Sequence, residues 1–245
     1  MIFIQKNMKK QWDNEAEMSI MEHLEELRRR IFISLAIFLI LTIICFIYIK
    51  NISYILQQPA IGIKFLQLAP GEYFFASIKV ATYTGFILSS PFTIYQIMLF
   101  ILPGLTKKEA SFLIPTLIAS IILFFIGILF SYKILAPAAL AFLIQYGAEI
   151  VEPIWSFEQY FNFILLLLFS TGIAFQIPII QIVLGTLEIF SSKQMISYWK
   201  YTIFISTIIG AILTPSTDPL TQICMSSAII LLYFGGILIL KIIKK

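Results

Sequence analysis

Long runs of apolar residues without charge constrain this chain more than any other feature of its sequence. Apolar residues make up 60% of its 245 residues and charged residues only 12%, about half the charged share of soluble domains. Crossing a bilayer core about 30 Å thick takes roughly 20 apolar helical residues. The sequence therefore predicts an all-α, polytopic membrane protein with six transmembrane helices, at 31–49, 74–98, 112–135, 160–184, 198–213 and 220–240.

The distribution of basic residues predicts the topology. With six spans, the two termini and the segments near 99–111 and 185–200 share one side and carry thirteen basic residues. The opposite side carries four, which are Lys50, Lys64, Lys79 and Lys133. Basic residues are retained on the cytoplasmic side of a membrane. We therefore expect both termini on the cytoplasmic or stromal (cis) side, with tails at 1–18 and 241–245 flanking one membrane domain at 19–240.

The stretch "HLEELRRR" precedes the first span. It is not an export signal, because the apolar run that follows is 19 residues long, lacks a small-x-small cleavage site and precedes further spans. Arg28–Arg30 can anchor the cis end of the helix. Glu25 and Glu26 each precede an arginine by four residues, a favourable ion-pair spacing. With an apolar stripe from Ile20 to Ile31, this pattern predicts an amphipathic helix lying on the cis interface.

Several kinds of function find no support in the sequence. His23 is the only histidine, and Cys45 and Cys224 both lie inside apolar runs, which excludes a metal site and favours buried thiols. No nucleophile with a base, phosphate loop or cofactor motif occurs, so neither catalysis nor a cofactor is predicted. Nucleic acid is not expected as a partner, since the basic residues lie in loops rather than in one stripe.

Four motifs in order resemble those of the TatC family, the multi-span receptor subunit of the twin-arginine protein translocase. "HLEELRRRI" is similar to its N-terminal H-L-x-E-L-R-x-R signature, and "SSPFTIYQIMLFILPGLTKKE" to its second-span and first cytoplasmic loop motif. "FQIPIIQ" and "ILTPSTDPLTQ" are similar to its fourth-span motif and to its turn between spans five and six. The resemblance covers residues 19–240 and implies a curved, glove-like bundle, which we expect to have short fifth and sixth spans.

The resemblance also implies a site for the paired arginines of an export signal. Carboxylates match guanidinium groups through charge-assisted hydrogen bonds. By motif position the signal-binding residues are Glu26, Glu109 and Phe100, with Arg28 and Pro103 supporting the cytoplasmic site. The alternatives are a simple ion pair of Glu26 with Arg30, a solvated loop acid at Glu109 and interfacial packing of Phe100.

Two further positions carry expectations from the family. Gln176 lies inside the fourth span, where the family can hold glutamate; its neutral amide is expected to contact either a partner helix or another helix of this chain. Asp218 lies in the trans-side turn before the sixth span, where it can cap that helix or support transport.

The function that the resemblance implies is recognition of twin-arginine signal peptides of folded precursors. It also implies assembly with single-span TatA/TatB-type subunits, homo-oligomers within the complex, a lipid environment and transport driven by the proton-motive force. A small-solute or ion permease is the alternative, but it would require paired ionisable groups near mid-membrane. The abundance of Ile, Phe and Lys is typical of an AT-rich genome, which favours a plastid thylakoid membrane over a bacterial plasma membrane.

Overall fold

The computed structural model describes residues 20–60, 62–104, 107–147, 154–213 and 219–243, and within these ranges the chain is almost entirely helical. Five of its helical segments are long and apolar enough to cross a membrane, and one is shorter. In chain order the helices that form these spans are α2 (Ile20–Ile47), α4 (Glu72–Ile101), α5 and α6 (Lys107–Phe130 and Ala136–Gly147), α7 and α8 (Phe157–Ala174 and Ile177–Thr186), α10 (Trp199–Leu213) and α11 (Pro219–Ile243). The predicted six-span, all-α architecture is confirmed.

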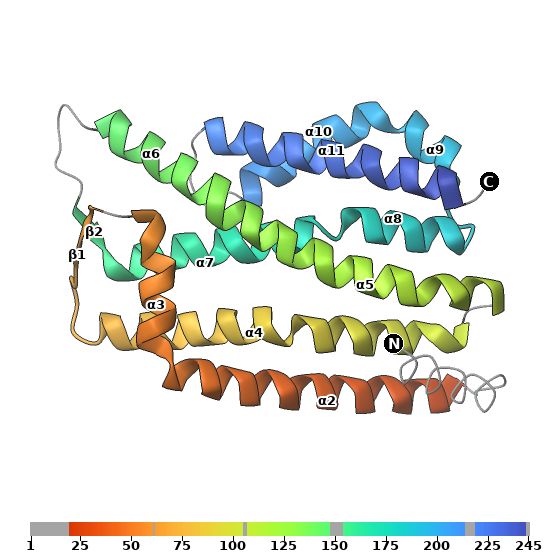
Figure 1. The fold of residues 1–245 in the computed structure, drawn as a ribbon, viewed down its shortest axis with the longest axis horizontal. Coiled ribbons are helices and arrows are strands. Elements are labelled where there is room, and N and C mark those ends of the chain that lie inside the picture. Colours follow the sequence, from red (N-terminus) through yellow and green to blue (C-terminus); the bar gives the residue numbers. More distant parts are fainter. Residues whose placement is uncertain (1–19, 61, 105–106, 148–153, 214–218, 244–245) are drawn as a thin grey trace.

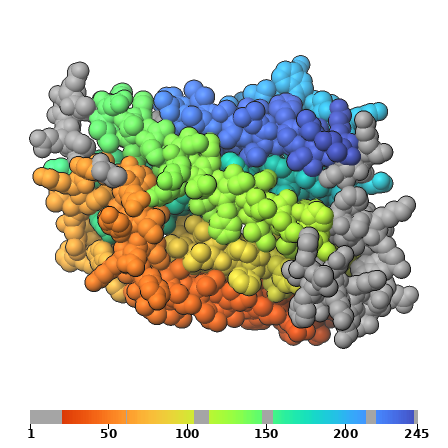
Figure 2. Space-filling model, viewed as in Figure 1, coloured from red at the N-terminus to blue at the C-terminus, as the bar shows by residue number. Residues whose placement is uncertain are grey.

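The spans run back and forth, so that the start of α2, the end of α4, the start of α5 and the end of α11 lie at the same end of the bundle (Figure 1). This end of the bundle is called the cis end below, after the topology that the basic residues predict. The small elements are the helices α3 (Ile49–Gln57) and α9 (Ser192–Ser197) and the strands β1 (Lys64–Leu66) and β2 (Ile154–Ser156). Figure 2 shows the same order of segments on one face, from α2 at one edge to α11 at the other.

Prolines account for the breaks within the spans, because a helical proline lacks an N–H group and its ring clashes with the carbonyl four residues earlier. Pro178 follows a break at 175–176 that divides the fourth span into α7 and α8. Pro137 follows a π-helical turn at Ser131–Leu135, which joins α5 to α6. Pro91 and Pro115 lie within the continuous helices α4 and α5.

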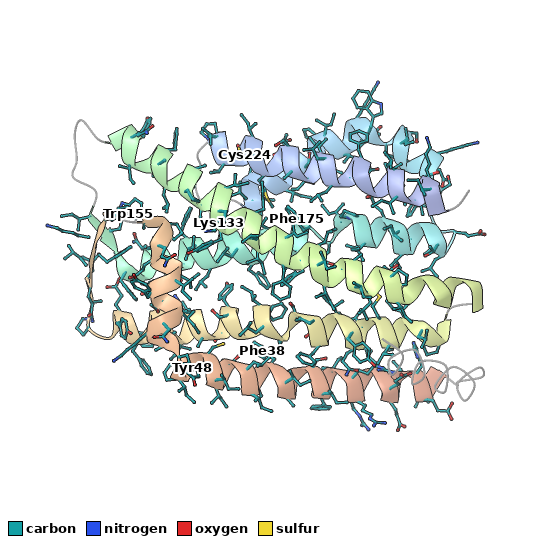
Figure 3. All side chains as sticks on the ribbon, in the orientation of Figure 1. Phe38, Tyr48, Lys133, Trp155, Phe175 and Cys224 are labelled. Atoms are coloured by element: carbon teal, nitrogen blue, oxygen red, sulfur yellow. The ribbon has the colours of Figure 1, made fainter. Side chains whose placement is uncertain are left out.

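The core is built around α7, whose Phe161, Ile164 and Leu165 are almost completely buried. The helices α4 and α5 pack against α7, and Ala136 and Leu140 of α6 belong to the same buried cluster. By contrast, α2 packs mainly on α4 and α10 mainly on α11. At the seam between α2 and α4, Phe38 on α2 lies edge-on to Phe86 on α4, with ring centroids 6.1 Å apart (Figure 3). The helix α2 is therefore an edge element that depends on one neighbour.

The trans end is closed by a polar network centred on Glu72 in the first turn of α4. One carboxylate oxygen accepts hydrogen bonds from Ser156 Oγ (2.6 Å) and the Glu158 amide (3.0 Å). The other oxygen accepts from the amides of Leu68 (2.5 Å) and Ala69 (3.2 Å). Since Ser156 ends β2, Glu158 lies in the first turn of α7, and Leu68 and Ala69 follow β1, Glu72 ties together the segments at the ends of the two parallel strands.

Two tyrosines fix α3 across the same end. Tyr160 donates its hydroxyl hydrogen to the Leu56 carbonyl (2.6 Å), and Tyr132 donates to the Ile55 carbonyl (2.7 Å). Both carbonyls lie in the last turn of α3, where a helix lacks its regular backbone donors, although the Ile55 carbonyl also accepts from the Gln58 amide. The tyrosines therefore add side-chain donors to the end of α3 and attach it to the bundle.

Two sequence-based expectations need correction. The "HLEELRRR" stretch is not a separate interfacial helix, because α2 runs without a break from Ile20 to Ile47. The sixth span is not short either, since α11 has 25 residues. Only the fifth span, α10, is short, with 15 residues. The helix continues through this charged stretch because Glu26 and Gln96 pair with the buried guanidinium of Arg30.

Candidate functional site

The cis end of the α2–α4 seam contains a buried ion pair. Arg30 donates from Nε to Glu26 Oε1 at 2.7 Å and also from Nη2 to the same oxygen. From α4, Gln96 accepts a hydrogen bond at its Oε1 from Arg30 Nη1, at 3.1 Å. Only 9% of Arg30 and 11% of the Glu26 side chain are exposed. The Glu26–Arg30 pair of the sequence is therefore formed, whereas Glu25 and Arg29 make no ion pair in the described part of the chain.

The second oxygen of Glu26 is the unusual feature of this pair. Among the described residues, Glu26 Oε2 is buried and has no hydrogen-bond partner; His23 Nδ1 lies 3.9 Å away. Buried carboxylate oxygens are normally satisfied, because desolvation without a hydrogen bond is costly. Glu26 is therefore half-satisfied and can accept a further donor.

His23 and Phe100 join the two helices just beside the pair. Their rings stack with centroids 4.3 Å apart and an interplanar angle of 13°. The sequence analysis identified neither this stack nor the contact made by Gln96. A signal for Gln96 was present, because it precedes Phe100 by four residues and therefore shares its helical face.

Two cavities meet at the pair. A cleft of about 900 Å³ is lined by acids and bases of α2 and by Gln96 and Tyr95 of α4. An apolar groove of about 430 Å³ is lined by Leu27, Ile31, Leu35, Phe38, Phe86, Ile97 and Phe100, among others. Arg30 and Gln96 line both, so their hydrogen bond lies on the boundary between a charged cleft and an apolar groove.

The other predicted site residues are distributed as follows. Arg28 is exposed and lines the charged cleft. Pro103 is half-buried in the 3₁₀ turn Leu102–Gly104 that ends α4. Glu109 belongs to the first turn of α5, at the same end of the bundle, but its side chain lies outside the described residues. The structure thus brings Glu26, Arg28 and Phe100 around the seam.

The two remaining candidates lie away from this seam. Gln176 donates from Nε2 to the Ser120 carbonyl (3.1 Å) and accepts from Ser120 Oγ (2.5 Å), so its amide pairs with α5 of the same chain. A contact with a partner helix remains a prediction. Asp218 lies outside the described residues. Within the described ranges, no group of three or more His, Cys, Asp or Glu side chains could hold a metal ion.

Comparison with known proteins identifies the family. The family model described as Sec-independent protein translocase protein (TatC) matches residues 22–227, which is most of the chain. The chain belongs to the TatC family. This family is that of a protein translocase component and not a family of catalytic enzymes.

Individual relatives agree with the family model. The chain is 74% identical over 229 residues to an uncharacterized tatC-like protein, ycf43, of Gracilaria tenuistipitata var. liui, covering 94% of this chain and 96% of that protein. It is 48% identical over 231 residues to the chloroplastic Sec-independent protein translocase protein TATC of Oryza sativa subsp. japonica, covering 94% of this chain and 64% of that protein. A crystal structure of the twin-arginine translocase receptor TatC superimposes with a TM-score of 0.80 at 38% identity, covering 91% of this chain and all of that one.

Proposed function

We propose that this protein binds the twin-arginine signal peptides of folded precursors at the cis end of the α2–α4 seam. The observation that carries the proposal is the unpartnered, buried Glu26 Oε2. A guanidinium group is the donor that best satisfies a carboxylate, because its N–H groups form charge-assisted and often bidentate bonds. Glu109 is proposed as the second carboxylate, since it begins α5 at the same end.

The apolar groove is the proposed docking place for the hydrophobic segment that follows the arginines. It directly adjoins the charged cleft, with Arg30 and Gln96 on the boundary. A signal has the same order of charge and hydrophobicity, a basic n-region followed by an apolar h-region. Complementarity of both charge and apolar surface therefore supports a peptide of this class over a small solute.

Partner subunits and location follow the same proposal. We infer that the protein assembles with single-span TatA/TatB-type subunits and with further copies of itself, since the family supplies the receptor subunit of a translocase. A plastid thylakoid membrane is the proposed location, supported by the chloroplastic relative and by the algal one. The proton-motive force is the proposed energy source.

Glu26→Ala and Glu109→Ala test the proposal. Each should reduce crosslinking of a twin-arginine precursor by about tenfold, because a charge-assisted contact is lost. Glu25→Ala is the matched control, since Glu25 lines the same cleft but is exposed and unpaired with Arg29. A twin-lysine precursor provides the ligand control.

Membrane insertion of every variant is checked by protease protection of the loops. Equal crosslinking of wild type, Glu26→Ala and Glu109→Ala in correctly inserted protein would contradict the proposed site.

A further inference from the structure

Arg30 already holds one oxygen of the carboxylate that the signal arginine is proposed to bind. All three of its guanidinium nitrogens are engaged, two with Glu26 Oε1 and one with Gln96. It is as buried as the carboxylate it pairs with. The binding carboxylate of the free receptor therefore already carries an arginine of its own.

We propose that Arg30 is an internal competitor for Glu26, and that a signal peptide binds by replacing its guanidinium on that carboxylate. This inference rests on the proposed function. A bidentate contact needs both oxygens of Glu26, but Arg30 holds Oε1 and leaves only Oε2. The incoming guanidinium therefore has to displace the resident one, which retains Gln96 as an acceptor on α4.

Arg30 could instead help binding by holding Glu26 in a favourable rotamer. Two effects oppose this reading. Displacement breaks two charge-assisted hydrogen bonds. The free energy lost with these bonds exceeds the conformational entropy that is saved when Arg30 holds the glutamate side chain in one rotamer. A resident cation also repels the arriving one at close range. Competition therefore outweighs preorganisation, and removing Arg30 should increase affinity for the peptide.

The test uses the full-length protein in detergent and a fluorescent synthetic peptide with two adjacent arginines followed by an apolar segment. Arg30→Met removes both the guanidinium group and its charge. Arg30→Lys removes the planar guanidinium group but keeps a positive charge. Fluorescence anisotropy should show tighter binding by about tenfold for Arg30→Met and by a smaller factor for Arg30→Lys. In a Glu26→Gln background the gain should disappear, because the competition is for that carboxylate.

The control for net charge is Lys193→Met. Lys193 is exposed on α9 and lines neither cavity, so its loss should change affinity by less than about twofold. Helical content by circular dichroism confirms folding of each variant. Equal or weaker peptide binding by folded Arg30→Met and Arg30→Lys, or a gain that persists without the Glu26 carboxylate, would overturn the inference.

A different result would point to the proposed function itself. Wild-type protein that binds twin-arginine and twin-lysine peptides equally, with no effect of Glu26→Gln, would overturn the proposed site and this inference with it. Wild-type protein that discriminates between the peptides, but gains nothing from loss of Arg30, would overturn the inference alone.

Discussion

Two buried glutamates, one at each end of the bundle, are satisfied to very different degrees. Glu72 at the trans end accepts four hydrogen bonds, two on each oxygen, and is 4% exposed. Glu26 at the cis end receives Arg30 on one oxygen, and the other oxygen accepts no hydrogen bond from the described residues. The donors to Glu72 are three backbone amides and the Ser156 hydroxyl, which belong to the segments at the ends of β1 and β2.

The difference separates a structural carboxylate from one that is available to a ligand. A buried acceptor with all its hydrogen bonds formed stabilises the geometry around it and has no capacity for another partner. A buried oxygen without a donor costs stability until something supplies one. Glutamate thus stabilises the structure at the trans end of the molecule, and at the cis end it provides an acceptor oxygen that a ligand can use.

Glu72→Ala should have the largest effect on stability. It leaves four donors unsatisfied and releases the two loops beside the β1–β2 bridge. We expect the unfolding temperature in detergent to fall by about 5 to 10 °C, as measured by the loss of circular dichroism on heating. Glu72→Gln keeps the shape of the side chain but is a weaker acceptor, so its unfolding temperature should lie between those of the wild type and of Glu72→Ala. An unchanged unfolding temperature would remove the contrast between the two glutamates.

Gly85→Ala should have the next largest effect, and it acts on the seam that carries Glu26. A Cβ atom at Gly85 would lie 2.8 Å from Thr42 Cα, a backbone atom of α2 that cannot move aside alone. We expect a loss of about 2 kcal/mol in unfolding free energy from overpacking, together with weaker peptide binding. Gly235→Ala is the matched control, because open space surrounds that position on α11.

Lys79→Met should have the smallest effect on the free energy of unfolding. Lys79 pairs with Glu158 at 2.5 Å beside the Glu72 network, but 42% and 33% of the two side chains are exposed. Solvent screening limits such a pair to about 0.5 kcal/mol. Glu158→Gln should give a similar change in unfolding free energy, and the double variant should add little. A loss as large as that of Glu72→Ala would show that the ion pair, rather than Glu72, holds the trans end together.

The spans could be predicted from sequence because a bilayer imposes a simple requirement of length and hydropathy. The 19-residue apolar run after Arg30 identified a span without any knowledge of tertiary contacts. Glu26 and Phe100 came from short motifs that resemble those of a family. Each of these signals is local in the chain.

The errors and omissions concern contacts between distant parts of the chain. Glu72 meets Ser156 and Glu158 across more than eighty residues, and no periodicity reports such a pairing. Arg30 meets Gln96 across 66 residues. That contact adds a neutral acceptor to the ion pair of Arg30 with Glu26, and α2 continues through a stretch that the sequence predicted to lie on the membrane interface. The partial use of Glu26 by Arg30 could not be predicted, because spacing shows that a pair can form and not which oxygen it uses.

The position of the seam in the chain has a consequence for biogenesis. His23, Glu26, Arg30, Gln96 and Phe100 all lie on α2 and α4, which leave the ribosome before the helices α5 to α11. Because α2 depends mainly on α4 for its packing, the hairpin that the two helices form contains the whole α2–α4 part of the site. Recognition chemistry at this end can therefore assemble early during synthesis, before the core around α7 exists to support it.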